Sequence, residues 1–328
     1  MKIKVASLKD LTLKALSKYG YSDEESTIIS EVLLFAQLRG NNQGIVKLIG
    51  KGIPRRPEGQ SPTNIKDTPV SALVDGNKTH AIIVMDQLTN IAIEKAGKSG
   101  IGMVGSFNTS ESTGILAYYV NKIAKAGFIG FAFSSAPFQT TAPFGSNEAR
   151  FCTNPLAYGI PTNSDPILFD MTTSSMAYYG LIEAKTAGKE VPEGTGFDST
   201  GKSSVNPAEI MGGALRTMAG HKGSGLALLV QILAGSLVGA DSFDSSSDNA
   251  GNFVIAIDPN LFTPTTEFKS RIADVSAKIK SARKIDGVDE ILLPGERGTK
   301  MSSQVISSGE IEVEDNLLAA LQKIVDSI

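Results

Sequence analysis

Residues 220–225 read Gly-His-Lys-Gly-Ser-Gly and lead directly into an apolar run over residues 226–238. Gln231 and Ser236 are the only polar residues that interrupt this run. An apolar helix without a polar stripe is usually buried on all sides. The run is too short to cross a bilayer, which takes about 20 apolar residues. It therefore predicts a buried central helix around which the rest of the chain is organised.

The start of this predicted helix is also a candidate binding site. The first turn of a helix offers unpaired N–H groups and a partial positive charge, and glycines let a ligand approach the backbone closely. Lys222 adds a full positive charge at the same place. Two interpretations follow, an anion or phosphate site and a glycine-rich turn before a buried helix. These residues leave both open, because their spacing matches neither the Rossmann nor the P-loop fingerprint.

The composition is that of a soluble globular protein. The chain has 328 residues, of which 41% are apolar, and a net charge of −3, and this length suits about two domains. No block of like charges occurs, which argues against nucleic acid or a membrane as a partner. The N-terminus lacks the apolar core of a signal peptide and there is one cysteine, so a cytoplasmic location is expected. Two histidines and one cysteine make no plausible zinc cluster, so no metal site is expected.

Helical patterns dominate the two ends of the chain, and strand patterns dominate the middle. Helices are expected over residues 7–38, with a break at 19–20, and over 82–96, 114–126, 266–281 and 314–328. Strands are expected at 71–74, 101–106, 129–134, 167–169 and 253–257. Ser22 and Glu25 have the spacing of a capping box before the second helix. This order predicts an α/β or α+β fold.

Several short pieces, taken in order along nearly the whole chain, resemble the type-2 malate/L-lactate dehydrogenase family. The pieces are Arg39-Gly40, Gly114 with Tyr118-Tyr119, Thr153-Asn154-Pro155, residues 170–174, Pro192-Glu193-Gly194 with Asp198 and Gly201, residues 220–226, residues 256–259 and residues 293–297. The family includes sulfolactate dehydrogenase, ureidoglycolate dehydrogenase, diketogulonate reductase and the cyclic-ketimine reductases. No single piece is decisive, but their common order makes chance unlikely.

The resemblance implies an NAD(P)-dependent oxidoreductase whose fold is not the Rossmann fold. Family members combine a helical domain built from both chain ends with a central α/β domain that has a largely antiparallel mixed sheet. In this chain the helical part corresponds to residues 1–70 with 226–328, which would carry the dimer contacts and the substrate side. Residues 71–225 correspond to the cofactor-binding domain. The resemblance also implies a homodimer.

Three segments contact the dinucleotide in the family, and this chain has all three. They are Asp170, Met171, Thr172, Thr173 and Ser174, then His221 and Lys222, and finally Gly295, Glu296 and Arg297. Whether the cofactor is NAD or NADP stays open. Two alternatives also stay open: Asp170 as an acid in a strand-end turn, and Glu296 with Arg297 as a surface ion pair.

The catalytic signature of the family is altered in this chain. Gln43 stands where the family has its proton-donating His, Asn42 where it has Ser, and Lys47 where it has an Arg suited to a substrate carboxylate. A neutral amide can orient a carbonyl but has no proton to give near neutral pH. Lys47 keeps a positive charge but lacks the bidentate fork of Arg. The changed residues therefore retain substrate binding and remove the usual proton donor.

A second family His is also missing, and its place is taken by Ser112. Cys152 replaces a Gly beside Thr153, which is a candidate substrate contact. Cys152 is either a reactive thiol or, as we favour, a small buried residue. His80 lies far from every motif and is interpreted as a structural or surface residue.

Four sources of the proton remain. His221 is slightly favoured because histidine is the residue type that most often donates protons in catalysis, although a helix-start residue that only touches the cofactor is the better-supported interpretation. Lys222 or Lys47 would serve if burial lowered its pKa. The third source is water held by Gln43, Ser110 and Ser112, and Glu111 is a weaker fourth.

Two functions fit these observations. The first is a reductase of a small 2-oxo acid or cyclic imino acid, with Lys47 as the carboxylate anchor; an iminium substrate already carries its proton and would ease the loss of the His. The second is a non-catalytic relative that binds a dinucleotide or another metabolite. The partner expected for the enzyme is a small-molecule carboxylate substrate.

Overall fold

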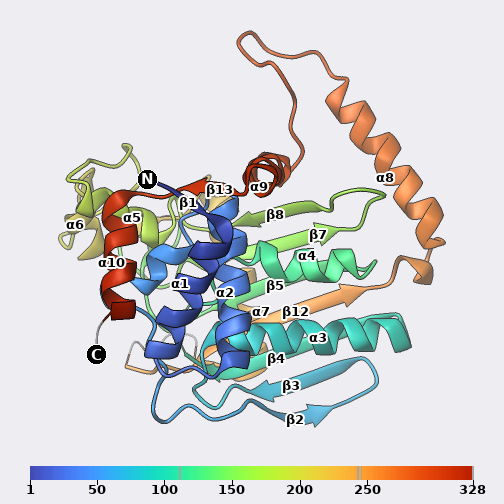
Figure 1. Cartoon of the computed structure of the whole chain (residues 1–328), viewed down its shortest axis with the longest axis horizontal. Coiled ribbons are helices and arrows are strands. Elements are labelled where there is room, and N and C mark those ends of the chain that lie inside the picture. The colour runs from blue at the N-terminus through green and yellow to red at the C-terminus, as the bar shows by residue number, and fades with distance from the viewer. Residues whose placement is uncertain (111, 242–243, 245, 327–328) are drawn as a thin grey trace.

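The computed structural model describes residues 1–110, 112–241, 244 and 246–326 (Figure 1). The helices are α1 (Val5–Lys18), α2 (Asp23–Leu38), α3 (Ala81–Ser99), α4 (Ala117–Lys125), α5 (Tyr178–Thr186), α6 (Pro207–Met211), α7 (His221–Ala234), α8 (Thr265–Lys280), α9 (Glu296–Ser308) and α10 (Asp315–Asp326), with 3-10 turns η1 (Ile45–Leu48), η2 (Ser236–Val238) and η3 (Pro259–Leu261). The strands are β1 (Lys2–Lys4), β2 (Thr63–Asp67), β3 (Ser71–Asp75), β4 (Ile101–Thr109), β5 (Ile129–Ser135), β6 (Thr141–Ala142), β7 (Leu156–Ile160), β8 (Ile167–Met171), β9 (Gly196–Phe197), β10 (Ser203–Ser204), β11 (Ala214–Arg216), β12 (Ala250–Ile257) and β13 (Glu310–Glu312).

A seven-stranded sheet with the order β2-β3-β4-β12-β5-β7-β8 forms the centre of the molecule. In this sheet β3 and β4 pair in parallel, and every other neighbouring pair is antiparallel. The prediction of a largely antiparallel mixed sheet is therefore confirmed. A smaller sheet has the order β10-β9-β11-β6, and β1 pairs with β13.

The two chain ends lie together, as the resemblance implied (Figure 1). Ile3 of β1 pairs with Ile311 of β13, and the N-terminal amino group lies 2.6 Å from Asp315. Helix α2 begins with the predicted capping box, in which Ser22 Oγ accepts from Glu25 N–H at 3.2 Å and the Glu25 carboxylate accepts from Ser22 N–H at 2.9 Å. This cap fixes the start of the helix whose far end carries Arg39 and leads to residues 41–47.

Strand β12 occupies a place that the predicted division of the chain did not give it. That division put residues 226–328 with the helical part, whereas β12 lies between β4 and β5 in the sheet. Val254 and Ala256 are fully buried in the core on one side of the strand, and Phe253 belongs to a second apolar cluster. A strand that is apolar on both faces belongs in the middle of a covered sheet. The division into two domains otherwise stays a prediction.

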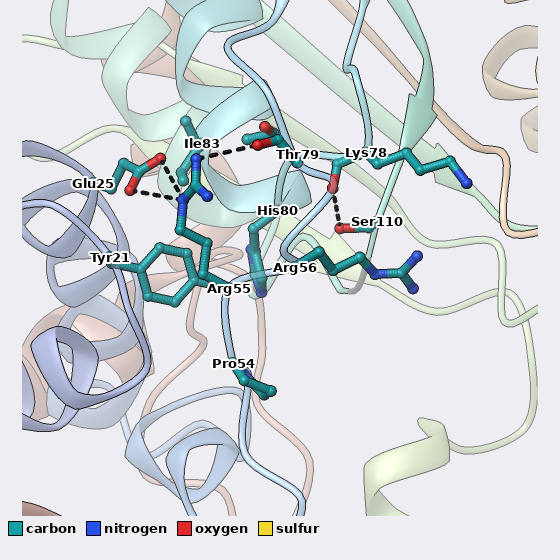
Figure 2. A pocket seen from close by; sticks show the side chains of 11 residues that line it. Tyr21, Glu25, Pro54, Arg55, Arg56, Lys78, Thr79, His80, Ile83 and Ser110 are labelled. Atoms are coloured by element: carbon teal, nitrogen blue, oxygen red, sulfur yellow. Dashed lines mark hydrogen bonds and ion pairs between the residues drawn. The ribbon is translucent and has the colours of Figure 1, made fainter.

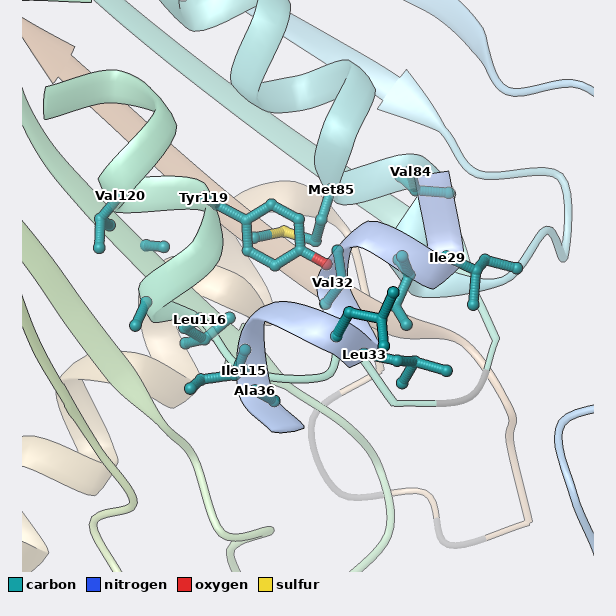
Figure 3. Close-up of a cluster of buried hydrophobic side chains, with 14 of the residues drawn as sticks. Ile29, Val32, Leu33, Ala36, Val84, Met85, Ile115, Leu116, Tyr119 and Val120 are labelled. Carbon is teal, nitrogen blue, oxygen red and sulfur yellow. The ribbon is translucent and has the colours of Figure 1, made fainter. Parts of the chain in front are cut away.

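The largest core lies between the sheet and helices α2, α3 and α4. Figure 3 shows Tyr119 of α4 beside Val32 of α2 and Met85 of α3, and all three are fully buried. The Tyr119 hydroxyl donates to the Thr113 carbonyl at 2.6 Å. This bond satisfies a buried hydroxyl that would otherwise be costly, and it ties the loop that carries Ser112 to the core.

Helix α7 is buried on one side only, so the prediction that it is enclosed on all sides is wrong. Val230 and Ala234 pack with Phe133 of β5 and Phe253 of β12. On the other side, apolar side chains are exposed by 44–60%, namely Leu228, Leu229, Ile232 and Leu237 (the last in η2). The reason is that α7 lies on the outer face of the sheet. By length and composition alone, residues 221–238 would suit a membrane, but core helices of soluble proteins pass the same test.

Candidate active site

Lys47 is the buried charge around which the candidate site is built. Its side chain is 3% exposed, and it lies in η1, where the fully buried Ile45 and Leu48 anchor the turn. The Lys47 ammonium donates to Ser112 Oγ at 3.0 Å and lies 3.8 Å from the ring centroid of Tyr179. A buried cation is stable only among such partners. The structure thus brings together two predicted site residues that are 65 positions apart.

Gly44 makes this turn possible. A Cβ at Gly44 would lie 2.4 Å from Gln37 Oε1, the same atom that accepts from Ile45 N–H at 3.2 Å. The same Cβ would lie 3.1 Å from Gln37 Cα, so a larger residue would crowd the backbone of α2 beside η1. Gly44 therefore places Lys47 through backbone packing, which explains the Gly beside Gln43 in the sequence.

Gln43 and Asn42 lie at the rim of the site and connect it to α5. Gln43 Nε2 donates to Asn42 Oδ1 at 3.3 Å, and Asn42 Nδ2 donates to Glu183 at 3.2 Å. Glu183 follows Tyr179 by four residues, so both side chains lie on one face of α5. Neither Tyr179 nor Glu183 was predicted from the sequence. The only sequence feature that could have linked them is their spacing of four residues. Together they place α5 over Lys47.

The loop that carries Ser112 forms the wall of the candidate site opposite α5. Ser112 Oγ accepts from Lys47 and also from Gly114 N–H at 3.2 Å. Ser110 is 3% exposed and its hydroxyl donates to the Lys78 carbonyl at 2.9 Å. The hydroxyl hydrogen of Ser110 is therefore occupied, which weakens the hypothesis of a water shared by Gln43, Ser110 and Ser112. Glu111 lies outside the described residues.

His80 lies behind this loop, so the interpretation that it is far from every motif is wrong. It is 5% exposed, and its backbone pairs with that of Ser110. Nδ1 accepts from Ile82 N–H at 3.1 Å and so caps α3, which agrees with the structural role considered for it. Figure 2 shows the ring between Tyr21 and Arg56, in a small pocket lined also by Arg55 and Lys78.

The His80 imidazole is neutral. Burial, together with the positive charges of Lys47 and Arg56, lowers its pKa to about 3. Because Nδ1 accepts a hydrogen bond, the ring proton of the neutral form sits on Nε2, which is buried without a hydrogen-bond partner among the described residues. His80 is therefore not a protonated imidazolium near neutral pH and does not act as a general acid.

His221 and Lys222 are both exposed at the start of α7. The His221 ring packs edge-on against Phe144 with centroids 5.9 Å apart. Among the described residues, no hydrogen bond or ring contact joins His221 to Lys47, Ser112 or Gln43. Gly223 is required here, because a Cβ would lie 2.0 Å from the Met218 carbonyl oxygen. Packing thus explains the glycine at position 223. No contact among the described residues supports His221 as the proton donor.

The end of β8 joins the loop that holds Thr153. Thr172 and Thr173 hydroxyls donate to the Thr153 carbonyl at 2.8 and 3.0 Å, and Ser174 donates to the Met176 carbonyl at 2.7 Å. Asp170 accepts from Ala117 N–H at 2.9 Å and so caps α4. Burial raises the pKa of Asp170 to about 6, although the backbone N–H groups of Ala117 and Leu116 oppose the shift. Its carboxylate therefore has a structural task besides any contact with a cofactor.

The segment before α9 touches the same strand. Gly295 has φ +87°, and a Cβ there would lie 2.8 Å from the Leu168 carbonyl oxygen of β8. Glu296 pairs with Lys280 at 2.8 Å and accepts from Leu293 N–H at 2.9 Å. Glu296 thus forms an ion pair, as one interpretation of the sequence proposed, but its partner is Lys280 of α8. Arg297 is exposed. The first turn of α9 and Arg297 have the N–H groups and the charge that suit a phosphate.

Two further points concern reactive groups. Burial raises the pKa of the Cys152 thiol, which keeps it protonated and favours the interpretation as a small packed residue. In the described parts of the chain, no group of three or more His, Cys, Asp or Glu side chains is placed to hold a metal ion.

Comparison with known proteins places this geometry in a family. The family model described as malate/L-lactate dehydrogenase matches residues 3–322. A malate/(S)-sulfolactate dehydrogenase of Methanothermus fervidus is 31% identical over 98% of this chain and 96% of its own length. The structure of malate dehydrogenase from Pyrococcus horikoshii has a TM-score of 0.86 and 28% identity, covering 100% of this chain and 97% of that one. The chain belongs to the malate/L-lactate dehydrogenase family.

As a member of this family, the protein is an oxidoreductase, and its fold is that of the sulfolactate and malate dehydrogenases. An NAD(+)-dependent ureidoglycolate dehydrogenase of Escherichia coli is also similar, at 28% identity over 97% of this chain and 94% of its own length. In this dehydrogenase the predicted residues form two groups. Lys47, Ser112, Gln43 and Asn42 make one, and Thr153 with the end of β8 makes the other. His221 and Lys222 touch neither group through any described hydrogen bond.

Proposed function

We propose that this oxidoreductase transfers a hydride between a nicotinamide dinucleotide and a small carboxylate, either a 2-oxo or 2-hydroxy acid or a cyclic imino acid. The observation that carries the proposal is the buried Lys47, held between Ser112 and Tyr179. An ammonium group forms strong charge-assisted hydrogen bonds with a carboxylate, so Lys47 suits a carboxylate substrate. The relatives named for sulfolactate and ureidoglycolate act on small carboxylates, which agrees with this assignment.

The chain's own residues would bind and orient the substrate. The Lys47 ammonium would donate hydrogen bonds to the substrate carboxylate in a site that α5 covers, and Ser112 keeps the ammonium in place. The Gln43 amide orients the carbonyl or imine group at the rim. When bound, the dinucleotide supplies or accepts the hydride. Gly295 and the start of α9 suit its phosphates, and the end of β8 suits a ribose or amide.

Proton supply favours an imine over a ketone. Gln43 cannot donate a proton to a developing alkoxide, and His80 is neutral because its pKa is about 3. A protonated iminium brings its own proton and needs only hydride. We therefore expect the cyclic imino acid to be the better substrate.

Steady-state assays test this function directly. Pyruvate, oxaloacetate and piperideine-2-carboxylate are compared at pH 7, each with NADH and with NADPH, which also decides the cofactor. We expect a higher kcat/KM for the imine than for either keto acid. Equal or higher rates on the keto acids would contradict the imine preference. Tight binding of NADH or NADPH without turnover on a broad panel would instead support a non-catalytic, metabolite-binding role.

We infer that the protein works as a homodimer in the cytoplasm. Support for the dimer comes from the exposed apolar side of α7, with Leu228, Leu229 and Ile232 exposed by 44–48%. Contiguous exposed apolar side chains usually mark a protein interface. Light scattering of the wild type and of Ile232→Glu tests this: we expect a dimer that the substitution weakens, and a monomeric wild type would contradict it.

A further inference from the structure

Tyr179 of α5 lies against the same ammonium group that we assign to the substrate carboxylate. The centroid of its ring is 3.8 Å from Lys47 Nζ, and its side chain is partly buried. A cation is attracted to the face of an aromatic ring by the negative charge of the π electrons. Tyr179 is therefore a wall of the candidate site, and it brings a phenol hydroxyl close to the buried cation.

The face of α5 that carries Tyr179 also reaches the rim of the site. Tyr179 and Glu183 are four residues apart and so lie on one face of the helix. Glu183 accepts from Asn42, which in turn accepts from Gln43. Tyr179 thus lies beside the space between the carboxylate anchor, Lys47, and the amide that orients the carbonyl. In a 2-oxo acid the carbonyl carbon is bonded directly to the carboxylate carbon, so a carboxylate at Lys47 brings the carbonyl oxygen near this ring.

Other side chains of the site do not meet the requirements of a proton donor. The Gln43 amide has no acidic proton, and His80 is held neutral by its burial. No described hydrogen bond or ring contact joins His221 to Lys47. A tyrosine phenol, by contrast, carries its proton near neutral pH and is one of the groups that serve as general acids in enzymes.

We propose that the Tyr179 hydroxyl donates the proton when a 2-oxo acid is reduced. The inference rests on the proposed function and adds to it the residue that supplies the proton. As the carbonyl carbon accepts the hydride, the π electron pair of the C=O bond moves to the oxygen. This oxygen forms a bond to the phenol proton while the phenol O–H bond breaks. The Lys47 charge stabilises the phenolate that is left, and a proton from water restores the phenol.

The two substrate classes respond differently to the loss of such a donor. A cyclic iminium ion already carries a proton on its nitrogen, so its reduction needs no phenol. Reduction of a 2-oxo acid produces an alkoxide that must be protonated. A tyrosine that only packs on Lys47 would instead affect both substrates alike, because both have a carboxylate to bind.

A single hydroxyl deletion tests the proposal. Tyr179→Phe removes the hydroxyl and keeps the ring against Lys47. Tyr178→Phe is the matched control, because the adjacent Tyr178 packs on Phe138, with ring centroids 5.6 Å apart. Steady-state assays compare pyruvate, oxaloacetate and piperideine-2-carboxylate in the wild type and both variants. We expect Tyr179→Phe to lower kcat/KM for the keto acids roughly a hundredfold and to leave the imine unchanged, and Tyr178→Phe to change neither.

Ionisation of the phenol gives a second readout that needs no cofactor. Ultraviolet difference spectra between the wild type and each Phe variant follow the phenolate of one tyrosine as the pH rises. Burial raises the pKa of Tyr178, whereas a neighbouring ammonium favours a phenolate. We expect the Tyr179 phenolate to appear at a lower pH than the Tyr178 phenolate. The reverse order would show that Lys47 does not stabilise the charge that the proposed step leaves on Tyr179.

The kinetic outcomes that contradict the proposal are distinct from failure of the proposed function. Wild-type keto-acid rates in Tyr179→Phe would overturn it. An equal loss for the imine would also overturn it, because the hydroxyl would then serve binding or packing. So would a wild type that reduces the imine but neither keto acid. A wild type that reduces none of the three substrates would overturn the proposed function, and this assignment with it.

Discussion

Lys47 and Lys222 are both candidate anion partners in the sequence, yet they lie in opposite physical settings. Lys47 is 3% exposed and fixed by Ser112 and the Tyr179 ring. Lys222 is exposed in the first turn of α7. A buried cation interacts strongly with a ligand charge because little water screens it, whereas an exposed one contributes little and is weakened by salt. This difference in burial supports our proposal that specific charge recognition takes place at Lys47 and not at Lys222.

The largest effect is expected from Lys47→Met. Loss of the buried charge should lower kcat/KM for the carboxylate substrate roughly a hundredfold, about 3 kcal/mol. Steady-state kinetics measure the loss, and thermal unfolding checks that the variant is folded. Lys47→Arg is the matched control and should recover part of the activity. If Lys47→Met kept the wild-type kcat/KM, Lys47 would not be the specific charge contact, and the proposed difference between Lys47 and Lys222 would be wrong.

The next largest effect is expected on stability as a function of pH, through the buried His80 near Lys47. The folded pKa of His80 is about 3 against an ordinary 6.5, so below pH 6.5 the unfolded chain takes up a proton that the folded chain does not. Stability is therefore lost as the pH falls from 6.5 toward 3, by at most about 1.4 kcal/mol per pH unit. Asp170 acts in the opposite direction, because its pKa is raised to about 6.

Comparison with His80→Asn isolates the histidine. Asn keeps an acceptor for Ile82 N–H and so preserves the cap of α3. Urea unfolding between pH 4 and 7 should show the difference in unfolding free energy between wild type and variant growing with pH. A constant difference across this range would mean that His80 is not held neutral by its burial near Lys47 and Arg56.

A smaller effect is expected from Ser112→Ala. Removing the hydroxyl that accepts from Lys47 at 3.0 Å should lower kcat/KM about tenfold, near 1.4 kcal/mol, which is within the range for hydrogen bonds to charged groups. Ser112→Thr keeps the hydroxyl and is the control. If Ser112→Ala and Lys47→Met give additive losses, the two residues do not act together.

The smallest effect is expected from Lys222→Gln. An exposed charge at a helix start should add only about 0.5 kcal/mol to dinucleotide binding, roughly a twofold change in affinity. The change should shrink further at high salt. Calorimetry at two salt concentrations measures it, with Lys222→Arg as the control. A loss as large as that of Lys47→Met would reverse the comparison and place the main charge contact at α7.

Local features were predictable from sequence because neighbouring residues produce them. The Ser22–Glu25 capping box depends on residues three positions apart, and the strand pattern near residues 253–257 depends on alternation within one segment. The family resemblance pointed to Lys47 and Ser112, although not to their contact. Tyr179 and Glu183 were missed, because α5 becomes part of the site only through its packing over η1.

The sequence by itself determined the family and predicted many of the helices and strands and the altered chemistry at Gln43, since these depend on residue identity and short spacing. Only the tertiary structure decided which apolar and polar groups are buried. It left one side of α7 exposed, placed β12 in the middle of the sheet and enclosed His80 behind Ser110. Burial is a property of contacts between distant segments, and it is burial that sets whether a Lys or His is charged, screened or available to a ligand.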